Sequence, residues 1–245
     1  MGAPKRTAGP LNLLGLFVFF SLHAVHAQQS LSTSDLLRQF QAETVFWRQF
    51  EVAKAIVATK DAGVLPALEP WLTHQDRHLR GNAAFVFARL GDPRGFDVIV
   101  AILNDRSETR AVHQISSVGS PWTPGQIAED RYYAAHLLGD LRDPRAIPIL
   151  VPLLTDPDVN YIVPWSLGQI GDRSAIPPLI GLLGDSSSNM RVLAVHALVE
   201  LKATEALPRL RRLLDDTSRS NFGNLESVAG AARAAIAKLQ PDSVR

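Results

Sequence analysis

The stretch Asp130–Asp156, DRYYAAHLLGDLRDPRAIPILVPLLTD, contains the pattern that decides the fold. Its apolar residues recur at helical spacing on both sides of Asp143 and Pro144. An Asp-Pro pair between two apolar periodic segments is typical of a turn. The stretch therefore predicts two short helices joined by a Gly/Asp/Pro turn, and versions of it recur along most of the chain.

A three-residue step of the type Ala-Ile-Pro opens one helix of each copy. It ends at Pro66, Pro148, Pro177 and Pro208, with a degenerate copy ending at Asp97. The spacings are 97 − 66 = 31, 148 − 97 = 51, 177 − 148 = 29 and 208 − 177 = 31 residues, and 51 exceeds the other steps by one insertion. A period in this range indicates stacked pairs of helices. We therefore predict an all-α fold, an α-solenoid of antiparallel helix pairs.

The first helix of each pair, helix A, ends in a Leu-Leu pair or its equivalent followed by Asp. The second, helix B, carries small and apolar residues at a period of 3.6, which predicts a core-facing stripe. Gly91 and Gly171 suit a left-handed cap at the end of helix B. Asp92-Pro93 and Asp143-Pro144 suit the start of the next helix A, with Asp as the N-cap.

The pattern resembles the HEAT-like repeats of the phycobilisome lyase type over about residues 43–240. The resemblance rests on Leu90-Gly91-Asp92, Leu138-Gly139, Ala175-Ile176-Pro177 and Arg191. It implies a solenoid with helix A on the convex side and helix B on the concave side. It also implies that the turn Asp and the early Arg of helix B pair between neighbouring units as a structural ladder, here drawn from Asp76, Arg80, Asp105, Arg131, Asp156, Asp185 and Arg191.

The N-terminus has the layout of a secretory signal peptide. Lys5 and Arg6 precede the apolar run Leu11–Leu22, and Val25 and Ala27 place small residues before a cleavage point at Gln28. The run is too short for a spanning helix, which needs roughly 20 residues; an uncleaved anchor is the alternative. We assign residues 1–27 to the signal, residues 28–42 to an N-terminal segment with a capping helix, and residues 43–241 to the solenoid of about five helix pairs plus a C-terminal capping helix.

Composition narrows the classes of partner. Cleavage leaves 245 − 27 = 218 residues with a net charge of 23 − 24 = −1. A nearly neutral chain gives no case for nucleic-acid binding, which depends on Lys and Arg at phosphates. The chain has no cysteine, so disulfides and thiolate chemistry are excluded. We expect a periplasmic or secreted protein with no stable membrane insertion after cleavage.

Two insertions break the repeat, at residues 106–126 and 217–227, both between a helix A and a helix B. They are therefore expected on one edge of the solenoid. Trp122 lies in the first, flanked by Pro121 and Pro124. An aromatic residue in a loop stiffened by prolines suits binding; the alternative is a ring folded back as a plug.

A second departure lies in three columns of helix B spaced i, i+4 and i+8, which form one stripe. Rings replace the polar residues that repeats of this type usually present on the concave face. Rings on a concave surface suit stacking of a peptide or sugar chain; the alternative is burial of the column by strong curvature. The candidate binding residues are Phe85, Arg89, Tyr132, His136, Tyr161, Trp165 and His196, together with Trp122.

No nucleophile elbow, phosphate-binding loop or zinc-protease motif is present. His74 and His78 straddle a predicted turn, and His136 and His196 lie two repeats apart, too far to share a metal ion. We therefore predict no catalytic residue, metal or cofactor, and a non-enzymatic exported scaffold that binds a protein or peptide. The alternatives are a polysaccharide-binding module and, from the resemblance, a lyase or chaperone related to phycobilin lyases.

Overall fold

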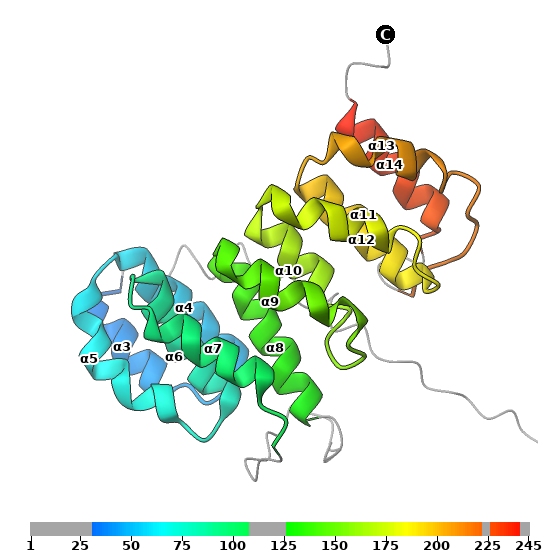
Figure 1. Ribbon diagram of the computed structural model, residues 1–245. Helices are drawn as coiled ribbons and strands as arrows, with labels where there is room; N and C mark the ends of the chain where they lie inside the picture. Colours follow the sequence, from blue (N-terminus) through cyan, green and yellow to red (C-terminus); the bar gives the residue numbers. More distant parts are fainter. Residues whose placement is uncertain (1–30, 108–125, 222–225, 241–245) are drawn as a thin grey trace, which may run out of the picture.

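The computed structural model describes residues 31–107, 126–221 and 226–240 as a curved stack of helix pairs (Figure 1). The residues of the signal assigned to 1–27 lie outside these ranges. Within them, no helix is both long and apolar enough to cross a membrane. Helices A and B alternate along the chain. The helices A, with their 3-10 turns (η), are α3 Thr33–Ala42; η1 Ala62–Val64, α5 Leu65–Leu68 and η2 Glu69–Thr73; α7 Arg94–Asn104; η3 Pro144–Ala146, α9 Ile147–Leu150 and η4 Val151–Thr155; η5 Arg173–Ala175 and α11 Ile176–Leu182; and η6 Thr204–Ala206 and α13 Leu207–Arg211. The helices B are α4 Phe46–Thr59, α6 Arg77–Arg89, α8 Gln126–Leu141, α10 Val163–Ile170, α12 Ser188–Glu200 and α14 Val228–Leu239.

Several helices A are broken into 3-10 and α segments, which the repeat pattern did not predict. Prolines account for the breaks, because each removes a backbone N–H and clashes with the preceding turn. Pro70 and Pro152 stand in the first turn of η2 and η4, directly after α5 and α9. Helix α7 has no proline within its bounds and runs unbroken from Arg94 to Asn104.

The end of helix B repeats one backbone conformation. Gly91 and Gly171 have φ of 93° and 79°, so the predicted left-handed caps are confirmed. Lys60, Arg142 and Lys202 hold the same position in the other units at φ of 56°, 55° and 50°. The fold therefore imposes a left-handed residue after each B helix that precedes an A helix, whether or not the sequence supplies glycine.

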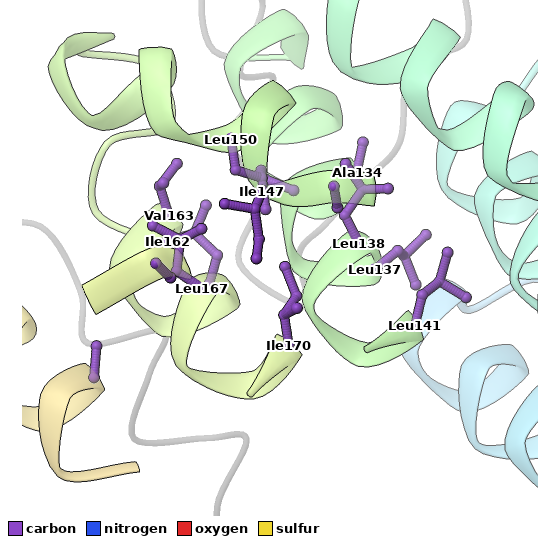
Figure 2. Close-up of a cluster of buried hydrophobic side chains, with 14 of the residues drawn as sticks. Ala134, Leu137, Leu138, Leu141, Ile147, Leu150, Ile162, Val163, Leu167 and Ile170 are labelled. Carbon is purple, nitrogen blue, oxygen red and sulfur yellow. The ribbon is translucent and has the colours of Figure 1, made fainter. Parts of the chain in front are cut away.

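The core lies between the two helix layers. Figure 2 shows one section of it, where leucines of α8 meet Ile147 and Leu150 of α9 and Leu167 of α10. The helices B pack on one another in succession, from α4 on α6 through to α12 on α14, whereas the helices A pack mainly on helices B. The B layer is therefore the more closely packed of the two, and we call it the inner layer after the concave side that the resemblance implies.

Small residues permit this crowding. A Cβ on Gly139 of α8 would lie 2.8 Å from the Cα of Ser166 in α10, so the two backbones approach as closely as a glycine allows. A Cβ on Gly168 would lie 3.3 Å from the Cα of Ala197 in α12. The small positions of the B helices thus fix the spacing between neighbouring repeats.

Each end of the stack has a capping helix. Ser32 caps α3 and forms a capping box with Asp35. On the following α4, Phe50 is buried, whereas Trp47 stays 45% exposed. At the other end, α14 is the predicted C-terminal capping helix.

Candidate functional site

The centre of the predicted stripe is a pair of rings from two adjacent repeats. The imidazole of His136 on α8 stacks against the indole of Trp165 on α10, with ring centroids 4.5 Å apart and planes inclined by 26°. A Cβ on Gly139 would lie 3.1 Å from Cζ3 of Trp165, so the indole lies over α8 where it has no side chain. Both rings are half-buried. They form a ledge on the inner layer between α8 and α10.

Charged groups surround this ledge. Nε2 of His136 lies 3.4 Å from Oδ2 of Asp140, one turn further along α8. On the neighbouring α4, Nζ of Lys54 lies 2.7 Å from Oε1 of Glu51 and 5.1 Å from the ring centroid of Phe50. Burial lowers the pKa of His136 and raises that of Asp140. A ring pair flanked by a carboxylate and an ammonium offers apolar ring edges and hydrogen bonding to a ligand.

The two tyrosines of the predicted stripe differ in where they lie. Tyr132 lies one turn before His136 on α8 and is half-buried, and its burial raises its pKa to about 12. Tyr161 is 37% exposed, but it precedes α10 rather than lying on it. The prediction that Tyr161 and Trp165 share a helix face is therefore wrong. Pro164 is the reason: it occupies the first turn of α10, where a missing N–H costs no helix bond, and it kinks nothing.

We define the concave aromatic cluster as Tyr132, His136 and Trp165. The other stripe residues lie apart from it. Phe85 is only 4% exposed and packs edge-on against Phe50, so its assignment to an exposed binding surface is wrong. At that end of the stripe, curvature buries the column against the adjacent repeat. Arg89 is exposed and donates from Nη1 to the Leu141 carbonyl, 3.3 Å away, at the end of the next B helix.

His196 connects the stripe to the second insertion. Its side chain is 59% exposed, and Nε2 lies 3.3 Å from Oε2 of Glu226. The base of that insertion is closed by the Ser220 amide, which donates to the Glu226 carbonyl at 2.9 Å. Trp122, the predicted ring of the first insertion, lies outside the described residues.

The predicted ladder exists between some units. Arg131 is 2% exposed and donates to Asp156 Oδ2 at 2.7 Å, Asp158 Oδ2 at 2.8 Å and the Leu103 carbonyl at 2.8 Å. The Arg131 hydrogen bond lowers the pKa of Asp156 to about 2. Arg106, the first residue of the long insertion, also donates to Asp156 and Asp158, at 2.7 and 3.2 Å. The insertion is thereby tied to the following repeat.

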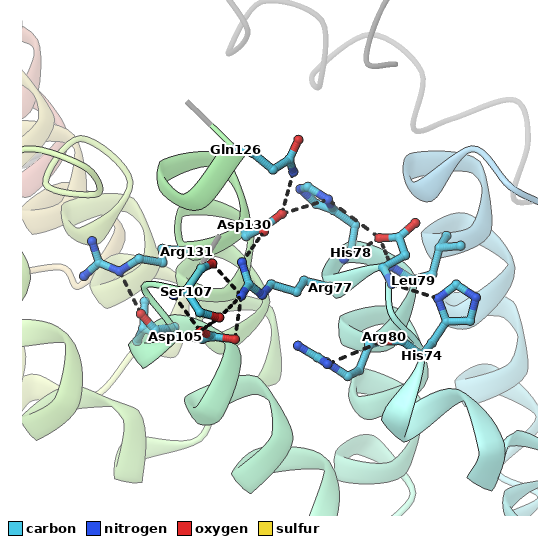
Figure 3. A network of polar contacts seen from close by, with 12 residues as sticks. His74, Arg77, His78, Leu79, Arg80, Asp105, Ser107, Gln126, Asp130 and Arg131 are labelled. Atoms are coloured by element: carbon cyan, nitrogen blue, oxygen red, sulfur yellow. Dashed lines mark hydrogen bonds and ion pairs between the residues drawn. The ribbon is translucent and has the colours of Figure 1, made fainter. Parts of the chain in front are cut away.

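Other predicted rungs need correction. Arg80 does not pair with Asp105; its Nη1 donates to the His74 carbonyl at 3.3 Å. Arg77, three residues earlier, forms the ion pair with Asp105 instead, at 2.6 Å, and lies between Asp105 and Asp130 (Figure 3). Asp76 caps α6 by accepting from the amides of His78 and Leu79, at 2.8 and 3.1 Å.

The C-terminal rungs of the ladder also agree only in part with the prediction. Arg191 pairs with Asp216 of the next unit at 2.9 Å and also donates to the backbone carbonyl of Asp185. The carboxylate of Asp185 accepts from the Ser187 amide instead of an arginine. Asn160 stands at the arginine column of the preceding unit, which explains the missing rung.

A buried polar network that the sequence did not predict lies between α4, α6 and α8. Figure 3 shows the part of it around His78 and Asp130. Asp130 and His78 are 1% and 2% exposed, with Oδ1 and Nδ1 3.4 Å apart. The hydroxyl of Tyr133 donates to Oδ1 of Asn82, and Asn82 in turn donates to Gln49 at 3.0 Å. These groups are enclosed, so they fix the packing of three helices rather than meet a ligand.

The described residues contain no group of three or more His, Cys, Asp or Glu side chains placed to hold a metal ion. His74, one of the two histidines considered for such a site, stacks on Trp71 at 5.1 Å and accepts from the Asp76 amide. The inner face offers ring contacts, hydrogen bonds and charge pairs.

Comparisons with known proteins agree with the repeat pattern. The model of the PBS lyase HEAT-like repeat matches residues 79–105 and 130–156, and the model of HEAT repeats matches residues 155–222. No curated protein matches the chain. The described helices, together with these matches, show an all-α solenoid built from HEAT-like repeats.

Similar solved structures include an engineered protein, with a TM-score of 0.46 and 19% identity over 85% of this chain and 96% of that one. A designed armadillo repeat protein has a TM-score of 0.44 and 17% identity over 85% of this chain and 100% of its own. The Escherichia coli protein YibA has a TM-score of 0.35 and 14% identity over 97% of this chain and 99% of its own.

Proposed function

We propose that this solenoid is a non-enzymatic, exported scaffold that binds an extended segment of a protein on its inner face. Solenoids of stacked helix pairs present extended concave surfaces, and such surfaces are what repeat proteins use for binding. The inner face here is formed by the B helices. The long-loop edge, from which both insertions emerge, is the second part of the proposed surface.

The observation that carries the proposal is the stacked pair of His136 and Trp165. The two rings come from adjacent repeats, and Asp140 lies 3.4 Å from the imidazole. Peptides suit this arrangement better than sugars, because rings already stacked on each other and half-buried present edges rather than a free flat face. A backbone N–H of an extended peptide finds an acceptor in the Asp140 carboxylate.

The edge contributes through its ties to the repeats. Arg106 binds the aspartates of the following unit, and Glu226 pairs with His196 on the stripe. A ligand that crosses the concave aromatic cluster toward α12 reaches His196 and the base of the second insertion. The predicted contact through Trp122 stays a prediction, because that residue lies outside the described residues.

Affinity capture from the native envelope fraction tests this function. Wild-type protein and the double variant Trp165→Ala/Tyr132→Ala are compared, with Trp47→Ala as the control, because Trp47 is an exposed ring outside the cluster. We expect the double variant to lose the partner and the control to keep it. Equal capture by all three proteins contradicts binding at the cluster. Capture of a polysaccharide instead of a protein favours the alternative module, and a shift in bilin absorbance on incubation favours the lyase.

Export requires a separate measurement. We propose cleavage after Ala27, which follows from the layout of the N-terminal residues. N-terminal sequencing of the mature protein should begin at Gln28. A mature chain that keeps Leu11–Leu22 and stays with the membrane fraction supports an anchor instead.

A further inference from the structure

A groove lies on the outer layer between α11 and α13, away from the concave aromatic cluster. Its volume is about 270 Å³, and Ile180, Leu183 and Leu213 give it an apolar lining. Arg209 and Arg212 of the α13 segment complete the lining. Leu183 is buried, Ile180 and Leu213 are half-buried, and both arginines are exposed. An apolar trench therefore has two guanidinium groups beside it.

The repeat itself shows that these arginines are unusual. Arg209 and Arg212 stand one and four residues after the third position of their Ala-Leu-Pro step, and Val98 and Ala101 hold the same columns in the α7 unit. The α7 unit has the counterpart groove, about 340 Å³ in volume, and there the lining holds both a cation and an anion, Arg80 and Asp105. The same two columns elsewhere hold only apolar or small residues: Ala67 and Pro70, Ile149 and Pro152, Pro178 and Gly181.

Three other arginines of the outer layer, Arg94, Arg145 and Arg173, pair with a nearby carboxylate. Arg94 pairs with Glu69 and Asp92, and Arg173 pairs with Glu205 at 2.6 Å. For Arg209 and Arg212, the described part of the chain supplies no ion pair. Two adjacent cations without a carboxylate are mutually repulsive, and an acidic ligand relieves that repulsion.

The groove also has room for a side chain. A Cβ placed on Gly181 meets nothing within 4 Å, and one placed on Gly184 meets only the Gly181 carbonyl at 3.6 Å. Neither glycine has positive φ. The two glycines are therefore not needed for a turn or for helix packing, and their effect is to leave the wall of the groove open.

We propose that the groove between α11 and α13 binds an acidic peptide segment that inserts an apolar side chain against Ile180 and Leu183. Carboxylates on both sides of the inserted residue pair with Arg209 and Arg212, because a guanidinium offers two parallel donors to a carboxylate. This site lies on the layer opposite the inner face, so it goes beyond the proposed function and does not depend on it.

Fluorescence anisotropy with a labelled Glu-Glu-Leu-Leu-Glu-Glu peptide tests the site. We expect binding that weakens roughly tenfold in Arg209→Gln/Arg212→Gln, because the variant removes both charge pairs, which together supply the ~1.4 kcal/mol of a tenfold change. Gly181→Trp, which fills the groove and leaves both arginines in the chain, should weaken binding by a similar factor.

The control variant Arg48→Gln/Arg233→Gln removes two exposed cations on α4 and α14 and should change affinity less than about twofold. A peptide with Gln in place of every Glu should not bind. Equal weakening in the control variant reduces the effect to net charge and overturns the proposal. Binding to vesicles of phosphatidylserine that depends on Arg209 and Arg212, with no peptide binding, overturns it in favour of a membrane contact.

Discussion

The imidazole of His136 and the indole of Trp165 are stacked across the boundary between two repeats, 4.5 Å from centroid to centroid. Because the rings belong to α8 and α10, the ledge they form exists only when those repeats are docked. Gly139 makes the docking possible, since any side chain there collides with the Ser166 backbone and the indole. Binding and stability are therefore coupled at this position.

Replacement of Trp165 by Ala should lower the free energy of unfolding by about 3 kcal/mol, the low end of the range for a large aromatic residue, because the ring is only half-buried. Trp165→Phe keeps a ring over Gly139 and should lose less. Trp47→Ala removes an exposed ring and should stay within about 0.5 kcal/mol. Urea denaturation of the three variants measures the differences; equal losses for Trp165→Ala and Trp47→Ala contradict the packing role.

Acid should destabilise the protein through His136. Burial lowers the pKa of His136; Asp140 opposes the shift, and Lys54 adds to it. The folded-state pKa thus lies below the ordinary histidine value of 6.5, and the unfolded chain binds more protons as pH falls through that value. The contribution of His136 to the free energy of unfolding should therefore be fully present above pH 6.5 and decrease as pH falls toward the folded-state pKa.

His136→Phe keeps a ring in the stack and removes the titrating group, so its melting temperature should fall less between pH 7 and pH 5, roughly the range of histidine titration. Asp140 titrates in the opposite sense, because burial raises its pKa and its protonation favours the folded state. The comparison should therefore be repeated in an Asp140→Asn background. A pH dependence that survives His136→Phe in both backgrounds assigns it to other groups.

The sequence predicted the solenoid because the fold depends on residue types at a regular period. Pro148, Pro177 and Pro208 mark helix starts, and the apolar stripes follow from helical geometry. The site was less accessible. The i, i+4 rule assumes a continuous helix, and it failed at Tyr161 because α10 begins two residues later. Burial of Phe85 depends on how strongly the stack curves, which no single repeat encodes.

The Arg80 rung of the ladder was predicted wrongly for a related reason. Arg77 and Arg80 lie on the same helix within one turn, and either is long enough to reach Asp105. The choice is made by Asp130, which is buried beside Arg77 and comes from beyond the long insertion. A partner from a distant segment cannot be read from a local repeat pattern.

The ladder makes a matched test of buried and exposed charge. Arg131 and Arg106 both bind Asp156 and Asp158, but their side chains are 2% and 60% exposed. Arg131→Met should cost about 3 kcal/mol, because it removes a buried guanidinium that pairs with Asp156 and Asp158 and also donates to the Leu103 carbonyl. Arg106→Met should cost at most about 1 kcal/mol, as expected for a surface pair screened by water. Similar losses in chemical denaturation contradict the buried role of Arg131.

Two glycines of the A helices should respond oppositely to alanine. A Cβ on Gly95 would lie 2.2 Å from the Ala84 carbonyl oxygen and 2.3 Å from the Ala88 amide nitrogen of α6. Backbone cannot move aside cheaply, so Gly95→Ala should cost at least ~3 kcal/mol, the upper part of the range for overpacking. Gly181→Ala meets open space and should stabilise α11 by up to about 1 kcal/mol. Thermal unfolding of both variants measures these changes in stability. A Gly95→Ala variant as stable as the wild type contradicts the close approach of α6 and α7.

Lys202 follows α12 at φ 50°, in a position where two other repeats have glycine. A side chain in this left-handed region costs roughly 1–2 kcal/mol, whereas glycine adopts it freely but loses more entropy on folding. The balance favours glycine by up to ~1 kcal/mol, so Lys202→Gly should raise the melting temperature. The converse change, Gly171→Lys, should lower it by a similar amount, since Gly171 has φ 79°. Lys238→Gly, within α14, is the control: it should destabilise, because there the residue is helical. If Lys202→Gly also destabilises, strain at the repeat boundary is not the property that separates the glycine-capped units from the others.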